Sequence, residues 1–339
     1  MLLPEARGAL SGATIDLLTG RESAIDLGAV SDDPIADDDL QLALWICYEL
    51  HYRGFECVDD GHEWSPQLIA FRGRLEEALL SALRRDVPVP DGGAPTAQRL
   101  REIVDADDGP QLSRYLQTDA NREQYLEFAV HRSIYQLKEA DPHTWVIPRL
   151  SGRAKAALVS IQTDEYGDGE PSRVHSELYR TLLRGFGLSD DYGYYVHAVP
   201  GITLAISNVM SLFGLHRELR GACVGHLAAY EMTSSVPCRR YARGARRIGA
   251  DDATCRFFDE HVTADALHEQ FAMHDLCGGL AEAEPELEPD ILFGAAACLY
   301  IDARFATHVL DAWANGRSSL LRPMKFGDPP RSQRLRAVS

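Results

Sequence analysis

Three ionisable residues recur at helical spacing in the segment EHVTADALH, residues 260–268. At about 3.6 residues per turn, His261, Asp265 and His268 fall on one helical face. Phe257 lies on the same stripe, so this is the face that a helix buries. Burying two imidazoles and a carboxylate without partners would cost roughly several kcal/mol, and a shared cation removes that cost. Hydrogen-bonded core histidines with an internal ion pair are the alternative, but three such residues at ligand spacing favour a metal site.

A second carboxylate, Glu231, ends an otherwise apolar helical stripe that includes Cys223, Val224, Leu227 and Ala228. Small residues on this stripe allow a neighbouring helix to approach closely. Taken alone, Glu231 is better interpreted as a surface glutamate near a helix end, because Pro237 follows soon after. It becomes a ligand candidate only beside the 261–268 motif.

Glu165 and His175 form a third candidate pair, ten residues apart. Glu165 ends an apolar helical stretch, but an unbroken helix would not put both side chains on one face. We therefore predict a kink, bulge or loop over residues 166–171, where the chain has Gly167, Gly169 and Pro171. The other acidic residues of this stretch are interpreted as a solvated turn: Asp164, Asp168 and Glu170.

Alternating β-branched runs are almost absent, whereas Ala, Leu, Arg and Glu fill long stretches with helical periodicity. The pattern predicts an all-α fold that builds its site from facing core helices. Ser65 is expected to cap a helix that starts at Pro66, and an acidic turn near 105–110 to separate two parts. We expect an N-terminal helical segment over 1–110, a catalytic domain over 111–322 and a polar mobile tail over 323–339. The predicted helices span residues 66–85, 96–106, 111–140, 152–165, 172–186, 192–213, 215–235, 251–276 and 289–314.

The composition limits the classes of function. A net charge of −17 argues against binding to nucleic acid or to an anionic membrane surface. The start of the chain lacks the features of a signal peptide, and the longest apolar run, 291–301, is too short to span a bilayer. Seven cysteines without a CxxC pair indicate reduced thiols. We therefore expect a cytoplasmic protein.

Together these elements resemble the haem-oxygenase-like diiron oxidases and oxygenases, the iron-containing redox enzyme family. The resemblance covers roughly residues 111–320, and it implies a bundle of about seven core helices with an N-terminal helical extension. In that family Glu and His come from one core helix, Glu from a second and His-x3-Asp-x2-His from a third. Here the resemblance implies the metal ligands Glu165, His175, Glu231, His261, Asp265 and His268.

The ten-residue spacing of Glu165 and His175 is similar to that of N-oxygenating members, in which a further upstream glutamate can serve as a ligand. Glu139 is the candidate here. Glu165, Glu231 and Asp265 carry three negative charges, and Glu139 would make a site with two ferrous ions neutral.

The resemblance also implies the reaction and its partners. Two iron ions would activate O2 to oxidise a small-molecule substrate, by N-oxygenation or by oxidative C–H or C–C cleavage of an amino or carboxylic acid. An external reductant and a homodimer are expected. The alternatives are a metal-binding helical protein without turnover, and a haem-binding or cofactor-free relative of the same fold. The carboxylates Asp265 and Glu231 argue against a haem pocket.

Overall fold

Helices account for all regular structure in residues 1–21, 30–90 and 92–327, which the computed structural model describes; of residues 263–267 only the backbone is described. This confirms the predicted all-α fold. A π-helical stretch, Phe271–Gly278, continues α13, and short 3-10 turns join other elements. The α-helices are α1 (Ala9–Leu18), α2 (Asp38–Glu49), α3 (Pro66–Asp86), α4 (Thr96–Asp105), α5 (Leu112–Thr118), α6 (Arg122–Gln136), α7 (Asp141–Thr144), α8 (Gly152–Glu165), α9 (His175–Phe186), α10 (Gly201–Leu215), α11 (Arg220–Thr233), α12 (Ser235–Arg247), α13 (Asp252–Gln270), α14 (Gly279–Ala283) and α15 (Glu288–Ala314).

Polar side chains fix several helix starts. Asp37 accepts hydrogen bonds from the backbone N–H groups of residues 39 and 40, and Ser65 caps α3, which begins at Pro66 as predicted. Asn121 and Gln124 form a reciprocal capping box at the start of α6. These caps satisfy N–H groups that have no partner within the helix.

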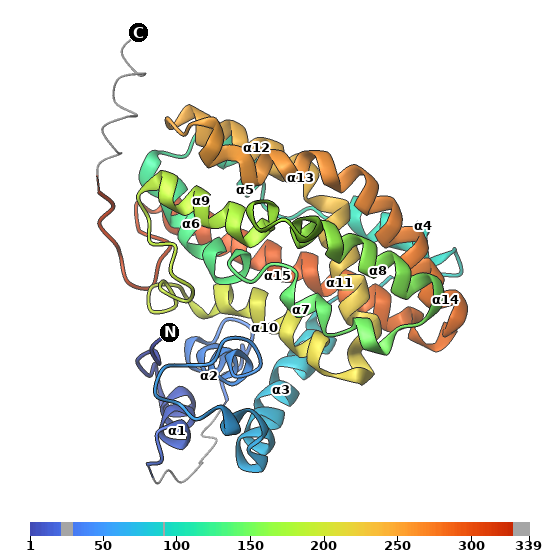
Figure 1. Ribbon diagram of the computed structural model, residues 1–339, viewed down its shortest axis with the longest axis horizontal. Coiled ribbons are helices and arrows are strands. Elements are labelled where there is room, and N and C mark those ends of the chain that lie inside the picture. Colours follow the sequence, from blue (N-terminus) through green and yellow to red (C-terminus); the bar gives the residue numbers. More distant parts are fainter. Residues whose placement is uncertain (22–29, 91, 328–339) are drawn as a thin grey trace.

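The long helix α15 runs along much of the length of the molecule, with α11 packed along it (Figure 1). The two helices meet through glycines. A Cβ atom on Gly225 would lie 1.8 Å from the carbonyl oxygen of Ile291, and one on Gly294 would lie 2.0 Å from that of Ala222. Only glycine permits this backbone-to-backbone contact. The small residues around Glu231 therefore serve the close approach that the sequence predicted.

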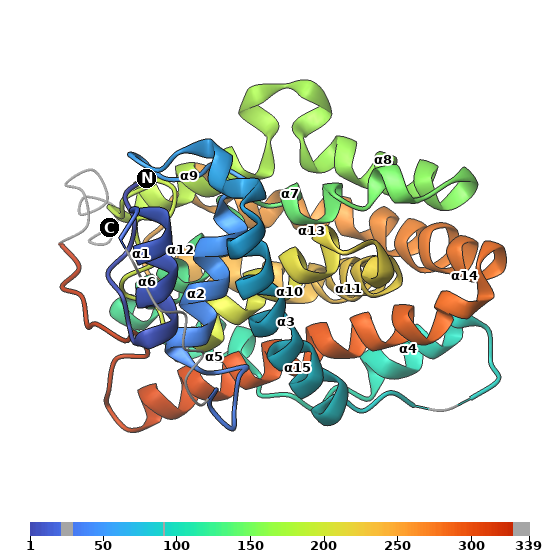
Figure 2. The same ribbon diagram turned by 90° about the horizontal axis from the view of Figure 1, so that it is seen from below.

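The N-terminal helices α1, α2 and α3 gather at one end of the molecule, where α2 packs against α10 (Figure 1). Helix α4 lies apart from them, along α15 and the π-helical stretch (Figure 2). The division of the chain at residue 110 stays a prediction. Within the described ranges, no helix combines the length and the apolar character needed to cross a membrane.

Two predicted helix boundaries were wrong, and one helix was not predicted. The helix expected over 111–140 is interrupted between α5 and α6, because the Asn121 capping box starts a new helix there. The helix expected from residue 192 begins only at Gly201, after Pro200, and residues 191–199 form turns. Helix α12 was not predicted, since the predicted helices leave residues 236–250 unassigned. Its Gly244 is buried against the backbone of Leu116 in α5.

Candidate metal centre

The predicted site residues come together from five parts of the fold. Glu165 is the last residue of α8 and His175 the first of α9, while Glu231 lies in the last turn of α11. His261 and His268 lie on α13, and Glu139 lies in the irregular turn between α6 and α7. The side chain of Asp265 lies outside the described residues.

The helix is interrupted between Glu165 and His175, as predicted. Two short 3-10 turns replace the helix there, and Figure 2 shows the connection projecting from the body of the molecule between α8 and α9. Gly167 has a φ of +67°, and a Cβ at this position would lie 2.6 Å from the backbone of Arg173 and Val174. A glycine is thus required to fold the connection back, so that both side chains reach the same interior.

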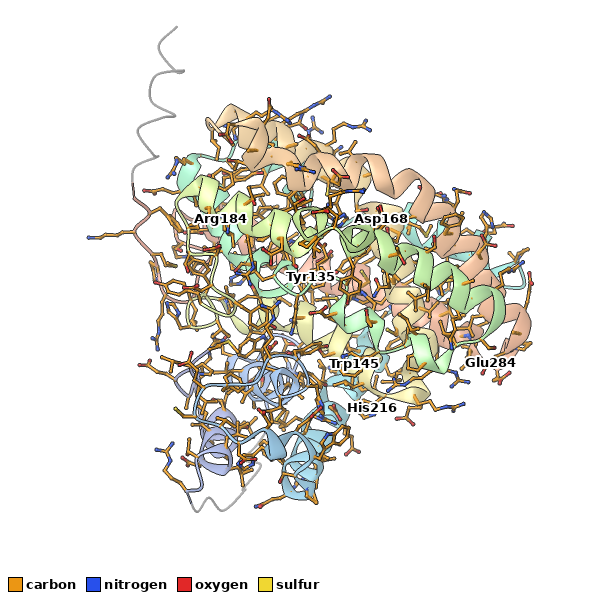
Figure 3. All side chains as sticks on the ribbon, viewed as in Figure 1. Tyr135, Trp145, Asp168, Arg184, His216 and Glu284 are labelled. Carbon is orange, nitrogen blue, oxygen red and sulfur yellow. The ribbon has the colours of Figure 1, made fainter. Side chains whose placement is uncertain are left out.

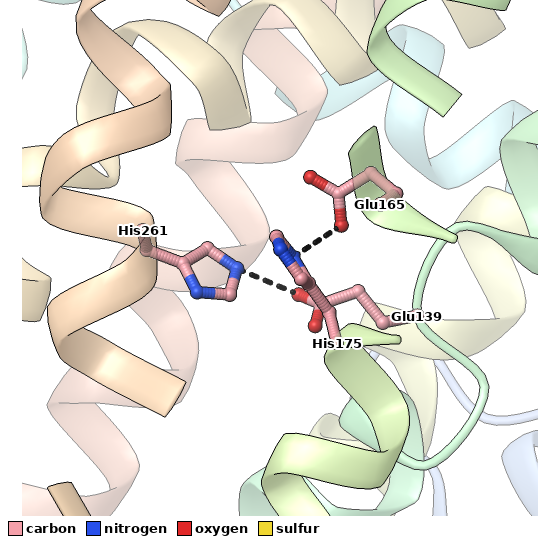
Figure 4. A group of neighbouring side chains, drawn as sticks. All are labelled: Glu139, Glu165, His175 and His261. Carbon is pink, nitrogen blue, oxygen red and sulfur yellow. Dashed lines mark ion pairs between the residues drawn. The ribbon is translucent and has the colours of Figure 1, made fainter. Parts of the chain in front are cut away.

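Four of these residues form a first cluster, shown in Figure 4: Glu139, Glu165, His175 and His261. Their candidate ligand atoms lie within 4.8 Å of one another, and all four side chains are buried. His175 Nδ1 lies 2.8 Å from Glu165 Oε2, and His261 Nε2 lies 3.5 Å from Glu139 Oε1. Two carboxylates and two imidazoles are a donor set that suits iron or manganese.

A second cluster consists of Glu165, Glu231 and His268, again with candidate ligand atoms within 4.8 Å of one another. His268 Nδ1 lies 3.3 Å from Glu231 Oε2. Glu165 belongs to both clusters, so its carboxylate lies where it could bridge two cations.

Several buried polar atoms of these clusters lie in ion pairs but make no hydrogen bond of good geometry. Glu165 Oε2 and His175 Nδ1 are buried without a hydrogen bond although they lie 2.8 Å apart. Glu139 Oε2 and His268 Nδ1 are buried without one as well. Each orphaned group costs roughly 1–3 kcal/mol. Carboxylate oxygens and imidazole nitrogens that converge on one space without hydrogen bonds are the arrangement that a bound cation requires. The residues present therefore fit a metal centre.

The histidine rings are oriented by their other nitrogens. His261 Nδ1 lies 2.8 Å from the carbonyl oxygen of Phe257, which can only accept, so this nitrogen donates and Nε2 faces the cluster. His268 Nε2 lies 3.1 Å from Asp164 Oδ2, which leaves Nδ1 facing Glu231. The sequence interpretation placed Asp164 in a solvated turn. Its position beside Glu165 in the last turn of α8 was the available signal that it contributes to the site.

In the metal-free site, the buried histidines and carboxylates shift one another's pKa values. Burial alone would lower the pKa of His268, but the carboxylate of Glu231 raises it to about 9. Burial likewise opposes the charge of His261, and Glu139 raises its pKa well above the usual value. Burial would raise the pKa of Glu165, yet the nearby His175 lowers it to about 2. Protons on the histidines thus balance the carboxylates when no metal does.

This proton content predicts that the metal-free protein loses stability as the pH rises above 7. His268 has a folded pKa of about 9 and an unfolded pKa near 6.5, so its contribution is complete below about 6.5 and is lost as the pH rises through about 9. The contribution of His268 to the free energy of unfolding should fall by roughly 1–2 kcal/mol between pH 7 and pH 8.5, and the raised pKa of His261 adds to the loss.

Denaturant unfolding in the presence of a chelator measures this change, and His268→Gln should reduce it by the contribution of His268 while that of His261 remains. His143 does not interfere, because burial lowers its pKa to about 4 and the ring is neutral in both states above pH 7. Constant or rising stability over this range would contradict the charge assignment.

A cavity of about 270 Å³ adjoins the carboxylates and is lined by Glu139, Glu165, Glu231 and His261. Aromatic side chains form part of its wall, and Figure 3 shows one of them, Tyr135, in the interior of the bundle. The aromatic residues are Phe128, Tyr135, Tyr179, Tyr230, Tyr241, Phe257, Phe258 and Phe305.

An ion pair also lies in the wall of this cavity. Arg132 Nη1 lies 3.4 Å from Asp302 Oδ1, and both residues line the cavity. The sequence analysis missed both. No local pattern in the sequence indicated either residue, because the pair forms between two separate helices.

The fold and the site define an all-helical protein with a buried histidine and carboxylate centre of the haem-oxygenase-like type. The chain belongs to the iron-containing redox enzyme family, whose model matches residues 126–303, more than half of the chain. This confirms the resemblance. No curated protein matches the chain. The matched region begins within α6 and ends within α15, and it contains all seven residues predicted as ligands.

Proposed function

We propose that the protein is a non-haem diiron oxidoreductase that activates O2 to oxidise a small molecule. The observation that carries this proposal is the pair of buried histidine and glutamate clusters that share Glu165. One cation would be held by Glu139, Glu165, His175 and His261, and the other by Glu165, Glu231 and His268. Asp265 is proposed as a further ligand, on the spacing of the α13 motif.

Charge and donor type support iron as the occupant. Glu139, Glu165, Glu231 and Asp265 together carry four negative charges, which balance two ferrous ions in a buried site. Oxygen and imidazole donors without thiolate favour Fe(II) or Mn(II) over Zn(II) or Cu(I). Bound ferrous iron would supply electrons for the reduction of O2, and an external reductant would restore them.

The protein's own part is to orient the substrate and to keep water away from the site. The aromatic part of the cavity wall would keep water from the apolar portion of a bound substrate. Arg132 offers guanidinium N–H groups to a carboxylate, and Asp302 offers a carboxylate to an amine. This pair supports an amino or carboxylic acid as substrate, with N-oxygenation or oxidative C–H or C–C cleavage as the reaction.

Anaerobic titration of the metal-free protein with Fe(II) tests the proposal. We expect about two ions per chain, since the ligands are too many for one ion that keeps an open position. His261→Ala should lose the ion of the first cluster and retain that of the second, with unchanged helicity by circular dichroism.

Exposure of the loaded protein to O2 should then produce a transient broad visible absorption, and oxidised products should form when amino and carboxylic acids are screened. A Soret band on haem addition would favour the haem-binding alternative instead. A wild-type stoichiometry of zero under anaerobic loading would refute the proposed centre.

A further inference from the structure

Lys138 and Glu139 are neighbours in the turn between α6 and α7, but their side chains have different surroundings. Glu139 faces His261 in the first cluster. The Lys138 ammonium is hydrogen-bonded to Glu49 Oε1 at the end of α2, with side-chain exposures of 1% and 0%. An ion pair this deeply buried is costly to desolvate and is weak evidence for a stabilising role.

The surroundings of this ion pair satisfy both charges. The second oxygen of Glu49 accepts a hydrogen bond of 2.6 Å from the hydroxyl of Tyr192. Lys138 Nζ lies 4.3 Å from the centre of the Tyr52 ring, in a cation–π contact. The ammonium is therefore held in one position by groups of the N-terminal segment.

The backbone of the same turn is held from two sides. Arg53 donates a 3.2 Å hydrogen bond to the carbonyl oxygen of Leu137, and Gln162 donates a 2.8 Å bond to that of Ala140. Ala140 has a φ of +74°, a left-handed conformation that costs a non-glycine residue about 1–3 kcal/mol. Such a conformation persists only where the surrounding contacts impose it.

We propose that Glu49, Tyr52 and Arg53 act through Lys138 and its turn as a clamp that positions Glu139 for the first metal ion. The inference rests on the proposed metal centre and goes beyond it by giving the N-terminal segment a role in the site. A ligand must be held within about 0.5 Å of its productive position. Fixing the Lys138 side chain and the carbonyl groups on both sides limits rotation of the peptide that carries Glu139. Glu49, Tyr52 and Arg53 are therefore positioning residues.

The geometry gives the clamp a selective consequence. Glu139 belongs to the first cluster and is not part of the second, which consists of Glu165, Glu231 and His268. Releasing the clamp should weaken one metal ion and leave the other bound. A general loss of stability would affect both.

The test uses the full-length double variant Glu49→Leu/Lys138→Met. Exchanging both partners for apolar residues leaves no unpaired buried charge, so the fold is retained where a single replacement would endanger it. Metal-free protein is titrated with Co(II), and visible absorption and equilibrium dialysis give the stoichiometry and the dissociation constants. We expect wild-type protein to bind two ions, and the double variant to bind one as before and the other about 10–100-fold more weakly.

A matched control is Arg72→Met/Glu76→Leu, which removes another buried ion pair of the N-terminal segment. This pair contacts Tyr48, His51 and His216, and no hydrogen bond or ion pair among the described residues joins it to the turn of Glu139. The control should bind both Co(II) ions like wild type. Two unchanged ions in the Glu49→Leu/Lys138→Met variant, or equal weakening of both ions, would overturn the clamp. Failure of wild-type protein to bind two ions would instead overturn the proposed metal centre.

Discussion

Replacing Glu165 with glutamine should remove both metal ions from the protein, and with them the consumption of O2. Among the side chains that the structure describes, Glu165 is the one common to the two clusters, so its carboxylate would supply a ligand and a negative charge to each ion. Glutamine keeps the size of the side chain and removes the charge, so the fold should be retained. Loss of one outer contact to a ligand costs about 10–100-fold in metal affinity, and loss of a shared ligand should exceed that for both ions.

Equilibrium dialysis against Fe(II) or Co(II), together with an oxygen electrode, measures the effect. Glu170→Gln is a matched control, because this exposed glutamate lies in the same connection and belongs to neither cluster. It should bind two ions as wild type does. A Glu165→Gln variant that retains one tightly bound ion would show that the carboxylate is not shared.

The second large effect is expected where α11 meets α15. Gly225→Ala and Gly294→Ala each place a Cβ atom 1.8–2.0 Å from a backbone oxygen, so the helices must separate. Overpacking typically costs about 1–3 kcal/mol, and contacts this close to backbone atoms should lie at or above the upper end. Because Glu231 follows on the same helix, separation should also weaken binding of the second ion.

The same substitution at Gly73 should have the opposite sign. Gly73 lies within α3, and a Cβ there would meet nothing within 4 Å. Alanine should therefore stabilise the protein by roughly 0.5–1 kcal/mol, as in an unhindered helix interior. Urea unfolding of the three variants measures these changes in the free energy of unfolding. Equal changes in stability for the Gly73 and Gly225 variants would show that the close contact between α11 and α15 does not require glycine.

The sequence predicted those parts of the site that depend on local spacing. His261 and His268 share a face because helical periodicity alone determines it, and the break after Glu165 follows from Gly167 and its positive φ. Glu139 was named through the resemblance, since no periodic pattern places a residue in an irregular turn. Its surroundings depend on Glu49, far away in sequence, and such pairing leaves no local signal.

Helix boundaries were predicted less well, for related reasons. Residues 191–199 form turns, and α10 begins only after Pro200. The composition of these residues did not distinguish them from the helix that follows. Helix α12 is rich in arginine and is positioned by long-range contacts, such as those of Arg247 with the carbonyl groups of Leu116 and Ala120. Neither the cavity nor the Arg132–Asp302 pair could be predicted, because each requires knowledge of how separate helices meet.

The π-helical stretch Phe271–Gly278 begins three residues after His268, so its length determines how the ligands of α13 are oriented relative to the residues that follow. A π-helix is wider than an α-helix and has more residues per turn, so it changes the rotational phase between the residues before and after it. His261 and His268 can therefore face the carboxylates while Ala272, Leu276 and Cys277 remain buried against other elements. Removing one residue from this stretch would alter the phase by about 100°, so a deletion that leaves every ligand in place would still change the face they share.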